Sequence, residues 1–231
     1  METIMTEFVK NLEFVRGRIA AAAHACGRDP KEITLVAVSK RHPRERILEA
    51  QAAGLRDFGE NYVQEALGKF PVAEARLHFI GPLQRNKVRK ILPLAFLIHG
   101  VGSLSVLEAA ERIAGELGLT RDLLLQLHLT GEATKSGFDL SEFRALLPDL
   151  AKLQHVRVRG LMCMGPLDGG SEAARPVFAH AHKLLGELRQ AIPTADILSM
   201  GMSEDLETAI AEGSTMVRVG TALFGARTEV P

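Results

Sequence analysis

Hydrophobic positions near the start of the chain recur at spacings of three and four residues, which places them on one face of an amphipathic helix. The face would comprise Ile4, Phe8, Leu12, Val15 and Ile19. Gly27 follows this pattern, and glycine commonly ends helices in the left-handed conformation. The segment therefore predicts an N-terminal helix that buries one apolar face.

Beyond this helix, short apolar runs rich in β-branched residues alternate with helical patterns. Several runs, such as LVAV and LLLQL, are apolar throughout, which is typical of strands buried on both faces. Eight strands are predicted in this way. They span residues 33–39, 56–59, 77–81, 95–100, 122–129, 156–164, 196–200 and 215–220.

This alternation predicts the fold class, because βα units in series form a parallel sheet with its helices outside. Eight units after one extra helix indicate an α/β fold with a single (β/α)8 TIM-type barrel over residues 1–231. The alternative is an open doubly wound sheet. Its glycine fingerprint is missing, since residues 100–105 follow a middle strand and lack the third glycine.

Composition narrows the classes of partner. The 28 basic and 28 acidic residues give no net charge, which argues against a general nucleic-acid binder. Cys26 and Cys163 form no C-x-x-C pair, so we expect neither a zinc site nor a disulfide framework, and a reducing cytoplasm is indicated. The first residues include glutamates, and no apolar run approaches the length of a membrane span, so neither a secretory signal nor membrane insertion is expected.

In barrels of this kind, chemistry is found at the carboxyl ends of the strands. Lys40 directly follows the first predicted strand, and a partly desolvated amine at such a place can attack a carbonyl group. The alternative is a solvent-exposed lysine at a strand end. Asn61 follows the second strand, where it would either bond a ligand oxygen or cap the next helix.

The segments after the seventh and eighth strands combine small residues, hydroxyl groups and the starts of helices. Backbone N–H groups at helix starts bind phosphate, and many barrels build a phosphate site from these two loops. Ordinary helix capping by serine and threonine is the alternative. The candidate phosphate residues are Ser199, Gly201, Ser203, Gly220 and Thr221.

Three further positions carry polar groups of interest. Arg218 lies inside the eighth strand, so it would either form an ion pair with an acidic neighbour or donate to a ligand atom. His78 lies inside the third strand and is expected to be a hydrogen-bonded core residue. Lys135 opens a glycine-containing loop after the fifth strand, which is either a second anion contact or a solvated loop.

Taken in order along the chain, these motifs resemble the pyridoxal phosphate homeostasis proteins, the YggS/PROSC family. The resemblance covers essentially the whole chain. The matching segments are residues 35–40 (LVAVSK), 58–65 (FGENYVQE), 78–87 (HFIGPLQRNK), 135–137 (KSG), 159–162 (RGLM), 198–210 (LSMGMSEDLETAI) and 213–227 (GSTMVRVGTALFGAR). The chain departs from the pattern at Arg41-His42, at His128 and in the loop 130–133, which affect the rim of the site.

The resemblance implies a fold like the N-terminal domain of alanine racemase, with pyridoxal 5′-phosphate (PLP) as cofactor. Lys40 would be the Schiff-base lysine, Arg218 would face the pyridine nitrogen, and Asn61 would lie near the ring. Ser199, Gly220 and Thr221 would contact the phosphate, with Gly201 and Ser203 close by. A second PLP site near Lys135 stays open.

The same residues bear on catalysis. An arginine partner does not keep the ring nitrogen protonated, which leaves a weak electron sink. Racemases of this type take a second base from a further β-domain, which we expect to be absent, and the chain's only tyrosine is Tyr62. We therefore expect a non-enzymatic PLP carrier, monomeric or weakly dimeric, with apo PLP-dependent enzymes as recipients. The alternatives are a weak racemase-like enzyme and a PLP-free Schiff-base aldolase or isomerase.

Overall fold

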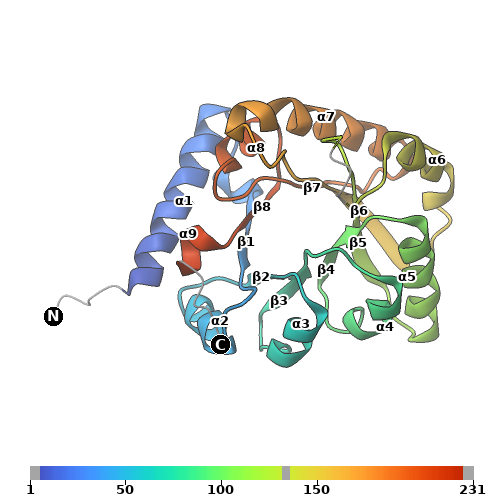
Figure 1. The fold of residues 1–231 in the computed structure, drawn as a ribbon, viewed down its shortest axis with the longest axis horizontal. Helices are drawn as coiled ribbons and strands as arrows, with labels where there is room; N and C mark the ends of the chain where they lie inside the picture. Colours follow the sequence, from blue (N-terminus) through green and yellow to red (C-terminus); the bar gives the residue numbers. More distant parts are fainter. Residues whose placement is uncertain (1–5, 132–135, 226–231) are drawn as a thin grey trace.

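Eight parallel strands close into a barrel in the computed structural model, which describes residues 6–131 and 136–225. Each strand pairs with the next along the chain, and β8 pairs with β1 to complete the ring (Figure 1). The strands are β1 (Thr34–Val38), β2 (Asp57–Glu60), β3 (Arg76–Phe79), β4 (Leu97–Val101), β5 (Arg121–Gln126), β6 (Val156–Met162), β7 (Ile197–Ser199) and β8 (Met216–Val219). The predicted TIM-type barrel is confirmed, and the doubly wound alternative was wrong.

Helices surround the barrel. They are α1 (Glu7–Ala25), α2 (Arg44–Ala52), α3 (Val63–Lys69), α4 (Val88–Ile91), α5 (Leu104–Glu116), α6 (Leu140–Leu150), α7 (Gly170–Ala191), α8 (Leu206–Ala211) and α9 (Thr221–Phe224), with short 3₁₀ turns at Pro30–Glu32 and Arg85–Lys87. Within the described part of the chain, none of these helices has the length and apolar character needed to cross a membrane.

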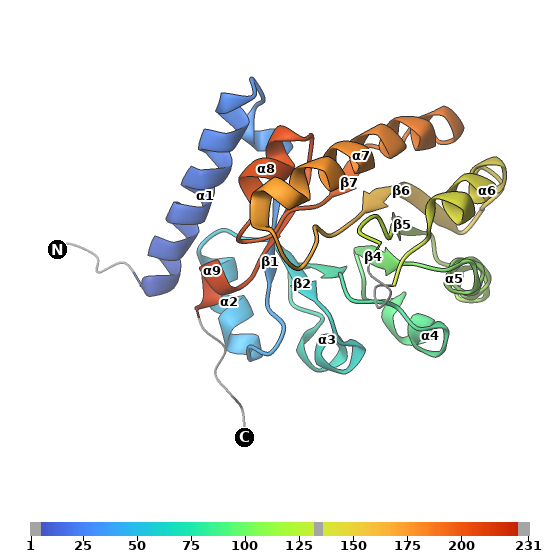
Figure 2. The ribbon, with the colours of Figure 1, turned by 45° about the horizontal axis from the view of Figure 1, so that its top comes forward.

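The first helix lies outside the βα repeat, as predicted. Its apolar face is buried through Phe8, Leu12, Val15 and Ile19, and Gly27 follows its end with a φ of 71°; Ile4 lies outside the described residues. The blue α1 runs beside the red α8 and α9 in Figures 1 and 2, and it contacts both. The N-terminal helix therefore covers the barrel where the chain closes it.

The fifth strand ends earlier than its apolar run predicts. Beyond Gln126, Leu127 still donates to the Met162 carbonyl of β6, but on its other side it forms an isolated bridge with Phe138, whose N–H donates to the Gln126 carbonyl while its own carbonyl accepts from His128. The returning chain thus takes the hydrogen bonds that a longer strand would need. The other predicted strands overlap the observed ones to within two residues at most ends, with β6 also stopping two residues short.

Two apolar cores lie on the two sides of the barrel wall. The larger one combines helix residues with strand residues such as Ala37 and Val217. The smaller one consists of Val36, Leu97, Leu124, Met162 and Met216, all of them on strands. Because side chains alternate along a strand, this smaller cluster fills the barrel interior. Inward-facing polar residues of the same strands lie next to it.

Candidate functional site

The predicted cofactor residues lie at or just beyond the carboxyl ends of four consecutive strands of the ring. The order β7-β8-β1-β2 brings together their carboxyl ends, and Val36 on β1 lies opposite Arg218 on β8. Lys40 follows β1, Asn61 follows β2, and the two small-residue loops follow β7 and β8. The barrel therefore gathers the predicted residues at one sector of its mouth.

The peptide that carries Lys40 is anchored from the side facing the helices. Lys69 on α3 donates to the Ser39 carbonyl at 2.9 Å and to Glu60 Oε1 at 2.9 Å, and the Ser39 hydroxyl donates to the same oxygen at 2.7 Å. Burial raises the pKa of the Glu60 carboxyl, although the charge and hydrogen bond of Lys69 oppose this. Lys40 itself is half-buried at the rim.

Sequence reasoning missed this anchor. Glu60 and Lys69 stand nine positions apart, and Lys69 meets the strand only because α3 folds back against β1 and β2. A carboxylate at the end of a strand was the available signal, because a buried carboxylate requires a partner.

Asn61 is half-buried, and its Oδ1 has no hydrogen-bond partner among residues 6–131 and 136–225. It does not cap the following helix, because Tyr62 occupies the N-cap position of α3. Gly81 packs directly on it: a Cβ at Gly81 would lie 2.1 Å from the Asn61 carbonyl oxygen. The neighbouring backbone therefore holds Asn61 with a buried acceptor still available, as a ligand contact requires.

The loop after β7 is shaped by glycine and by an aspartate. Gly201 has a φ of 93°, and a Cβ there would lie 2.5 Å from the Ala209 Cβ, so a side chain is excluded on both counts. The Met202 N–H donates to Asp205 Oδ1 at 2.6 Å. Asp205, not Ser203, is the N-cap residue of α8, and Ser203 is half-buried.

The loop after β8 lies beside the strand that leads to Lys40. A Cβ on Gly220 would lie 3.3 Å from the Val38 carbonyl oxygen, so the two strand ends approach closely. Gly220 is the N-cap residue of α9, and the exposed Thr221 is its first residue. Ser203 and Thr221 are therefore not the N-cap residues of α8 and α9.

Arg218 is buried, and its guanidinium bonds to a hydroxyl and a carbonyl rather than to a carboxylate. It donates to Ser199 Oγ at 2.7 Å and to the Cys163 carbonyl at 3.0 Å. Burial lowers the pKa of this guanidinium, while Cys163 and Asp205 act in the opposite direction. The group still carries its charge at neutral pH. Two roles were predicted for Arg218, and these contacts do not form the first of them, a direct ion pair.

Ser199 is fully buried, and its hydroxyl also lies 3.0 Å from His99 Nδ1. His99 Nε2 lies 3.0 Å from His78 Nδ1, and His78 Nε2 lies 2.8 Å from Asp57 Oδ1. His78 is thus a buried, hydrogen-bonded residue, as expected, but His99 and Asp57 were not singled out from the sequence. No local spacing could reveal them, because the contacts join β2, β3, β4 and β7.

A second group of buried polar atoms lies where β5 ends. Within the part of the chain that the structure describes, Gln126 Oε1, His128 Nδ1 and Thr130 Oγ1 have no hydrogen-bond partner, whereas Gln126 Nε2 donates to the Ser136 carbonyl at 2.7 Å. Buried polar atoms normally have partners, so these acceptors are typical of a place that receives a ligand or water. Lys135 lies outside the described residues.

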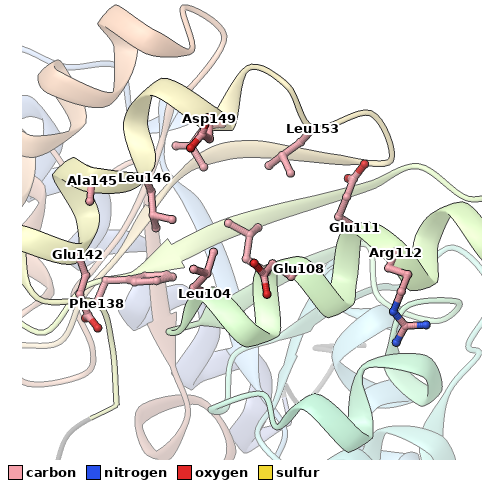
Figure 3. A pocket seen from close by; sticks show the side chains of 12 residues that line it. Leu104, Glu108, Glu111, Arg112, Phe138, Glu142, Ala145, Leu146, Asp149 and Leu153 are labelled. Atoms are coloured by element: carbon pink, nitrogen blue, oxygen red, sulfur yellow. The ribbon is translucent and has the colours of Figure 1, made fainter.

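The outer wall carries a groove of about 670 Å³ between α5 and α6. Figure 3 shows that Leu104, Leu146 and Leu153 contribute apolar side chains to it, with Glu108 and Glu111 along one side. None of the predicted cofactor residues lines this groove. The chemistry-bearing side chains are instead concentrated at the mouth and in the interior of the barrel.

Comparison with known proteins bears directly on this arrangement. The family model for the alanine racemase N-terminal domain matches residues 11–228. The pyridoxal phosphate homeostasis protein of Pseudomonas aeruginosa is 45% identical over 228 residues, which cover 96% of this chain and 97% of that protein. The chain belongs to the pyridoxal phosphate homeostasis protein family. The Escherichia coli K12 member is 42% identical over 236 residues, covering 96% of this chain and 98% of that protein.

Solved structures extend this family relationship to three dimensions. PipY of Synechococcus elongatus, solved without PLP, has a TM-score of 0.86 and 41% identity, covering 95% of this chain and all of that one. The same protein with PLP bound has a TM-score of 0.83. Alanine racemase of Corynebacterium glutamicum shares the fold alone, with a TM-score of 0.68 and 16% identity over 95% of this chain and 63% of that one.

Proposed function

We propose that this family member holds PLP reversibly as a Schiff base on Lys40 and takes part in PLP homeostasis. One observation carries the proposal. The ring order β7-β8-β1-β2 gathers a half-buried lysine, a buried arginine, and two loops built on Gly201 and Gly220 at one sector of the barrel mouth. An amine, a cation and backbone N–H groups are the complements of an aldehyde, a ring nitrogen and a phosphate.

Each predicted residue has a part in this proposal. The Lys40 amine binds the aldehyde carbon, Arg218 faces the pyridine nitrogen, and Asn61 contributes its buried acceptor near the ring. The loop residues Gly201, Ser203, Gly220 and Thr221 surround the phosphate. Ser199 is proposed on the same side, with its hydroxyl in contact with Arg218. Bound PLP supplies an electrophilic aldehyde and a conjugated ring.

The residues fit such a group on grounds of shape and polarity. A Cβ at Gly201 would collide with Ala209, so this position of the β7 loop carries no side chain. The buried oxygen of Asn61 has no partner within the described structure. A buried acceptor without a partner can receive a hydrogen bond from a ligand. A loop without side chains can bring its backbone N–H groups close to a phosphate.

We further propose that residues 1–231 act as one PLP-binding unit in the cytoplasm, without robust catalysis. The names of the relatives and the arginine opposite the ring nitrogen support a carrier over an enzyme. Tyr62 is 46% exposed at the start of α3 and belongs to no catalytic cluster described above. Apo PLP-dependent enzymes are the proposed recipients.

Titration with PLP, followed by visible absorbance, tests the binding. The wild type should develop a yellow band that saturates with one PLP per chain, and Lys40→Ala should lose it. Lys31→Ala is the matched control, because Lys31 is an exposed lysine in the turn before β1 and should leave the band unchanged. A wild type that stays colourless would overturn the proposal and favour phosphorylated carbonyl substrates on the same barrel.

The carrier role needs a second assay. The loaded protein is mixed with the apo form of a PLP-dependent enzyme, and recovery of that enzyme's activity is followed with time. Recovery faster than from the Lys40→Ala protein mixed with the same total PLP supports hand-over. Retention of the band with no recovery, or turnover of an amino acid by the loaded protein itself, would contradict it.

A further inference from the structure

A chain of side-chain hydrogen bonds crosses the interior of the barrel. It links Arg218 to Ser199 (2.7 Å), Ser199 to His99 (3.0 Å), His99 to His78 (3.0 Å) and His78 to Asp57 (2.8 Å). All five side chains are buried. The chain begins at the carboxyl end of β8 and ends at the first residue of β2, so it connects the proposed cofactor site with the opposite end of the barrel.

The two ends of this chain have fixed roles. A guanidinium has only N–H groups to offer, so Arg218 must donate to Ser199. An ionised carboxylate can only accept, so His78 Nε2 must donate to Asp57. Burial opposes ionisation of Asp57, but the hydrogen bonds from His78 and Arg76, together with the charge of Arg76, outweigh it and lower its pKa.

Two proton arrangements of the middle of the chain are compatible with these fixed ends. In the first, the Ser199 hydroxyl donates to His99 Nδ1, and His99 Nε2 donates to His78 Nδ1, so both imidazoles are neutral. In the second, an extra proton sits on His78 Nδ1, and His99 must turn its hydrogen toward Ser199. That leaves Ser199 accepting twice, with its own hydrogen lacking an acceptor among these contacts, and a buried donor without an acceptor is costly.

The count of satisfied donors favours the first arrangement, because every hydrogen in it has an acceptor. Burial is the main cause that holds the pKa of His99 well below its ordinary value, so His99 does not take the extra proton in either arrangement. Every hydrogen then points the same way, from Arg218 toward Asp57. Hydrogen bonds aligned in one direction polarise one another, and this chain ends on a carboxylate that complements the buried guanidinium.

We propose that His99 and His78 are positioning residues: with Ser199 and Asp57 they form a one-directional hydrogen-bond relay that holds the Arg218 guanidinium at the barrel mouth. The relay rests on the proposed function in one respect, because the group that Arg218 faces is taken to be the ring of PLP. Its geometry is independent of any ligand. It explains how an arginine with no hydrogen-bonded carboxylate stays fixed in a barrel interior, where an uncompensated charge is expensive.

The far end of the relay opens to a hollow of about 350 Å³ at the amino ends of the strands. Asp57, Arg76 and His78 line this hollow, together with Asp122 and Arg159. Arg76 is exposed and also bonds Asp57. The carboxylate is therefore held from the solvent side as well, which fixes the accepting end of the relay.

Long-range proton–nitrogen NMR of the labelled protein without PLP tests the relay directly. At about pH 7.5, where an ordinary histidine is neutral, His78 and His99 should both carry hydrogen on Nε2 and a bare Nδ1. The signals are assigned with His78→Gln and His99→Gln. Hydrogen on Nδ1 of either ring, or a cationic His78, would overturn the proposed direction.

A matched pair of variants tests the consequence for the mouth. In His99→Gln the amide oxygen can accept from Ser199 while its NH₂ group donates to His78, so the direction of the relay survives. His99→Leu removes both bonds. PLP should bind at least about tenfold more weakly to His99→Leu than to His99→Gln, as expected for losing support of a charged donor. Equal affinities of the two folded variants would overturn the positioning role.

The two tests separate the relay from the function. Failure of the wild type to bind PLP would contradict the proposed cofactor but would leave the histidine tautomers to be read in the same sample. Normal PLP binding combined with the wrong tautomers would contradict the relay alone. If His99→Leu does not fold, the tautomer measurement on the wild type still decides.

Discussion

At the scale of single residues, burial separates side chains that can react from those that only support others. Cys163 lies next to the site through its carbonyl, which accepts from Arg218. Burial raises the pKa of its thiol to about 12, even though the charge of Arg218 acts in the opposite direction. Cys26, at the end of α1, is exposed. The two cysteines should therefore differ sharply in reactivity, because the thiolate is the nucleophile.

Iodoacetamide labelling at about pH 8, near the ordinary pKa of a free cysteine, should modify Cys26 in the folded protein and leave Cys163 intact. In urea both should react. The sites are read by mass spectrometry of tryptic peptides, with Cys26→Ser as a control that should stay unlabelled when folded. Labelling of Cys163 at the rate of Cys26 in the folded chain would show that it is not buried as described.

Single residues also show which parts of the candidate site local sequence patterns could predict. Lys40, Asn61 and the loop glycines stand at strand ends, so knowing the strands was enough to propose them. His99 was not proposed, because its partners His78 and Ser199 are 21 and 100 positions away. A hydrogen bond across the barrel depends on which strands face one another in the closed ring, and no local spacing carries that information.

At the scale of elements, periodicity determined where helices and strands form, and tertiary contacts determined where they end. The helical period of α1 predicted its buried face correctly because that face packs on α8 and α9. The apolar run of the fifth strand continued to residue 129, but the strand ends at Gln126 because Phe138 takes the following hydrogen bonds. Hydrophobicity alone could not distinguish a strand from a buried loop.

The packing of α1 gives a stability prediction with an internal control. Leu12 is 1% exposed in the apolar face, whereas Phe14, two positions away, is 65% exposed. Leu12→Ala should lower the free energy of unfolding by about 2–4 kcal/mol, through lost burial and a residual cavity. Phe14→Ala should change it by less than about 0.5 kcal/mol.

Urea denaturation followed by circular dichroism measures both variants. If Phe14→Ala destabilised the protein as much as Leu12→Ala does, the helix would not pack through the face described here.

At the scale of the whole molecule, the barrel interior joins the proposed cofactor site to the opposite end through the relay. This makes folding sensitive to pH in a defined direction. The folded-state pKa of His99 is lower than its unfolded value, so below an unfolded pKa of about 6.5 the unfolded chain binds a proton that the folded chain does not. The stability contribution of neutral His99 is complete above that pH and declines as the pH falls.

Between the unfolded and folded pKa values of His99, this group should lower the free energy of unfolding by about 1.4 kcal/mol for each unit by which the pH falls. The groups facing His99 are His78 from β3, Ser199 from β7 and Arg218 from β8. His99→Gln cannot titrate, so its stability should fall less than that of the wild type between about pH 7 and about pH 5.5.

The comparison is made by urea unfolding of both proteins at each pH, with His24→Gln, an exposed histidine of α1, as the control that should follow the wild type. Parallel pH profiles for the wild type and His99→Gln would show that His99 titrates freely in the folded barrel and would contradict the burial of the relay.

Reduction with borohydride shows directly whether the Lys40 amine is the group that binds PLP. The protein is mixed with PLP, reduced, digested and mapped by mass spectrometry beside the Lys40→Ala variant. We expect a pyridoxyl phosphate group on the peptide carrying Lys40, and loss of that stable modification in the variant. A label spread over exposed lysines such as Lys31, or equal labelling of the variant, would contradict it.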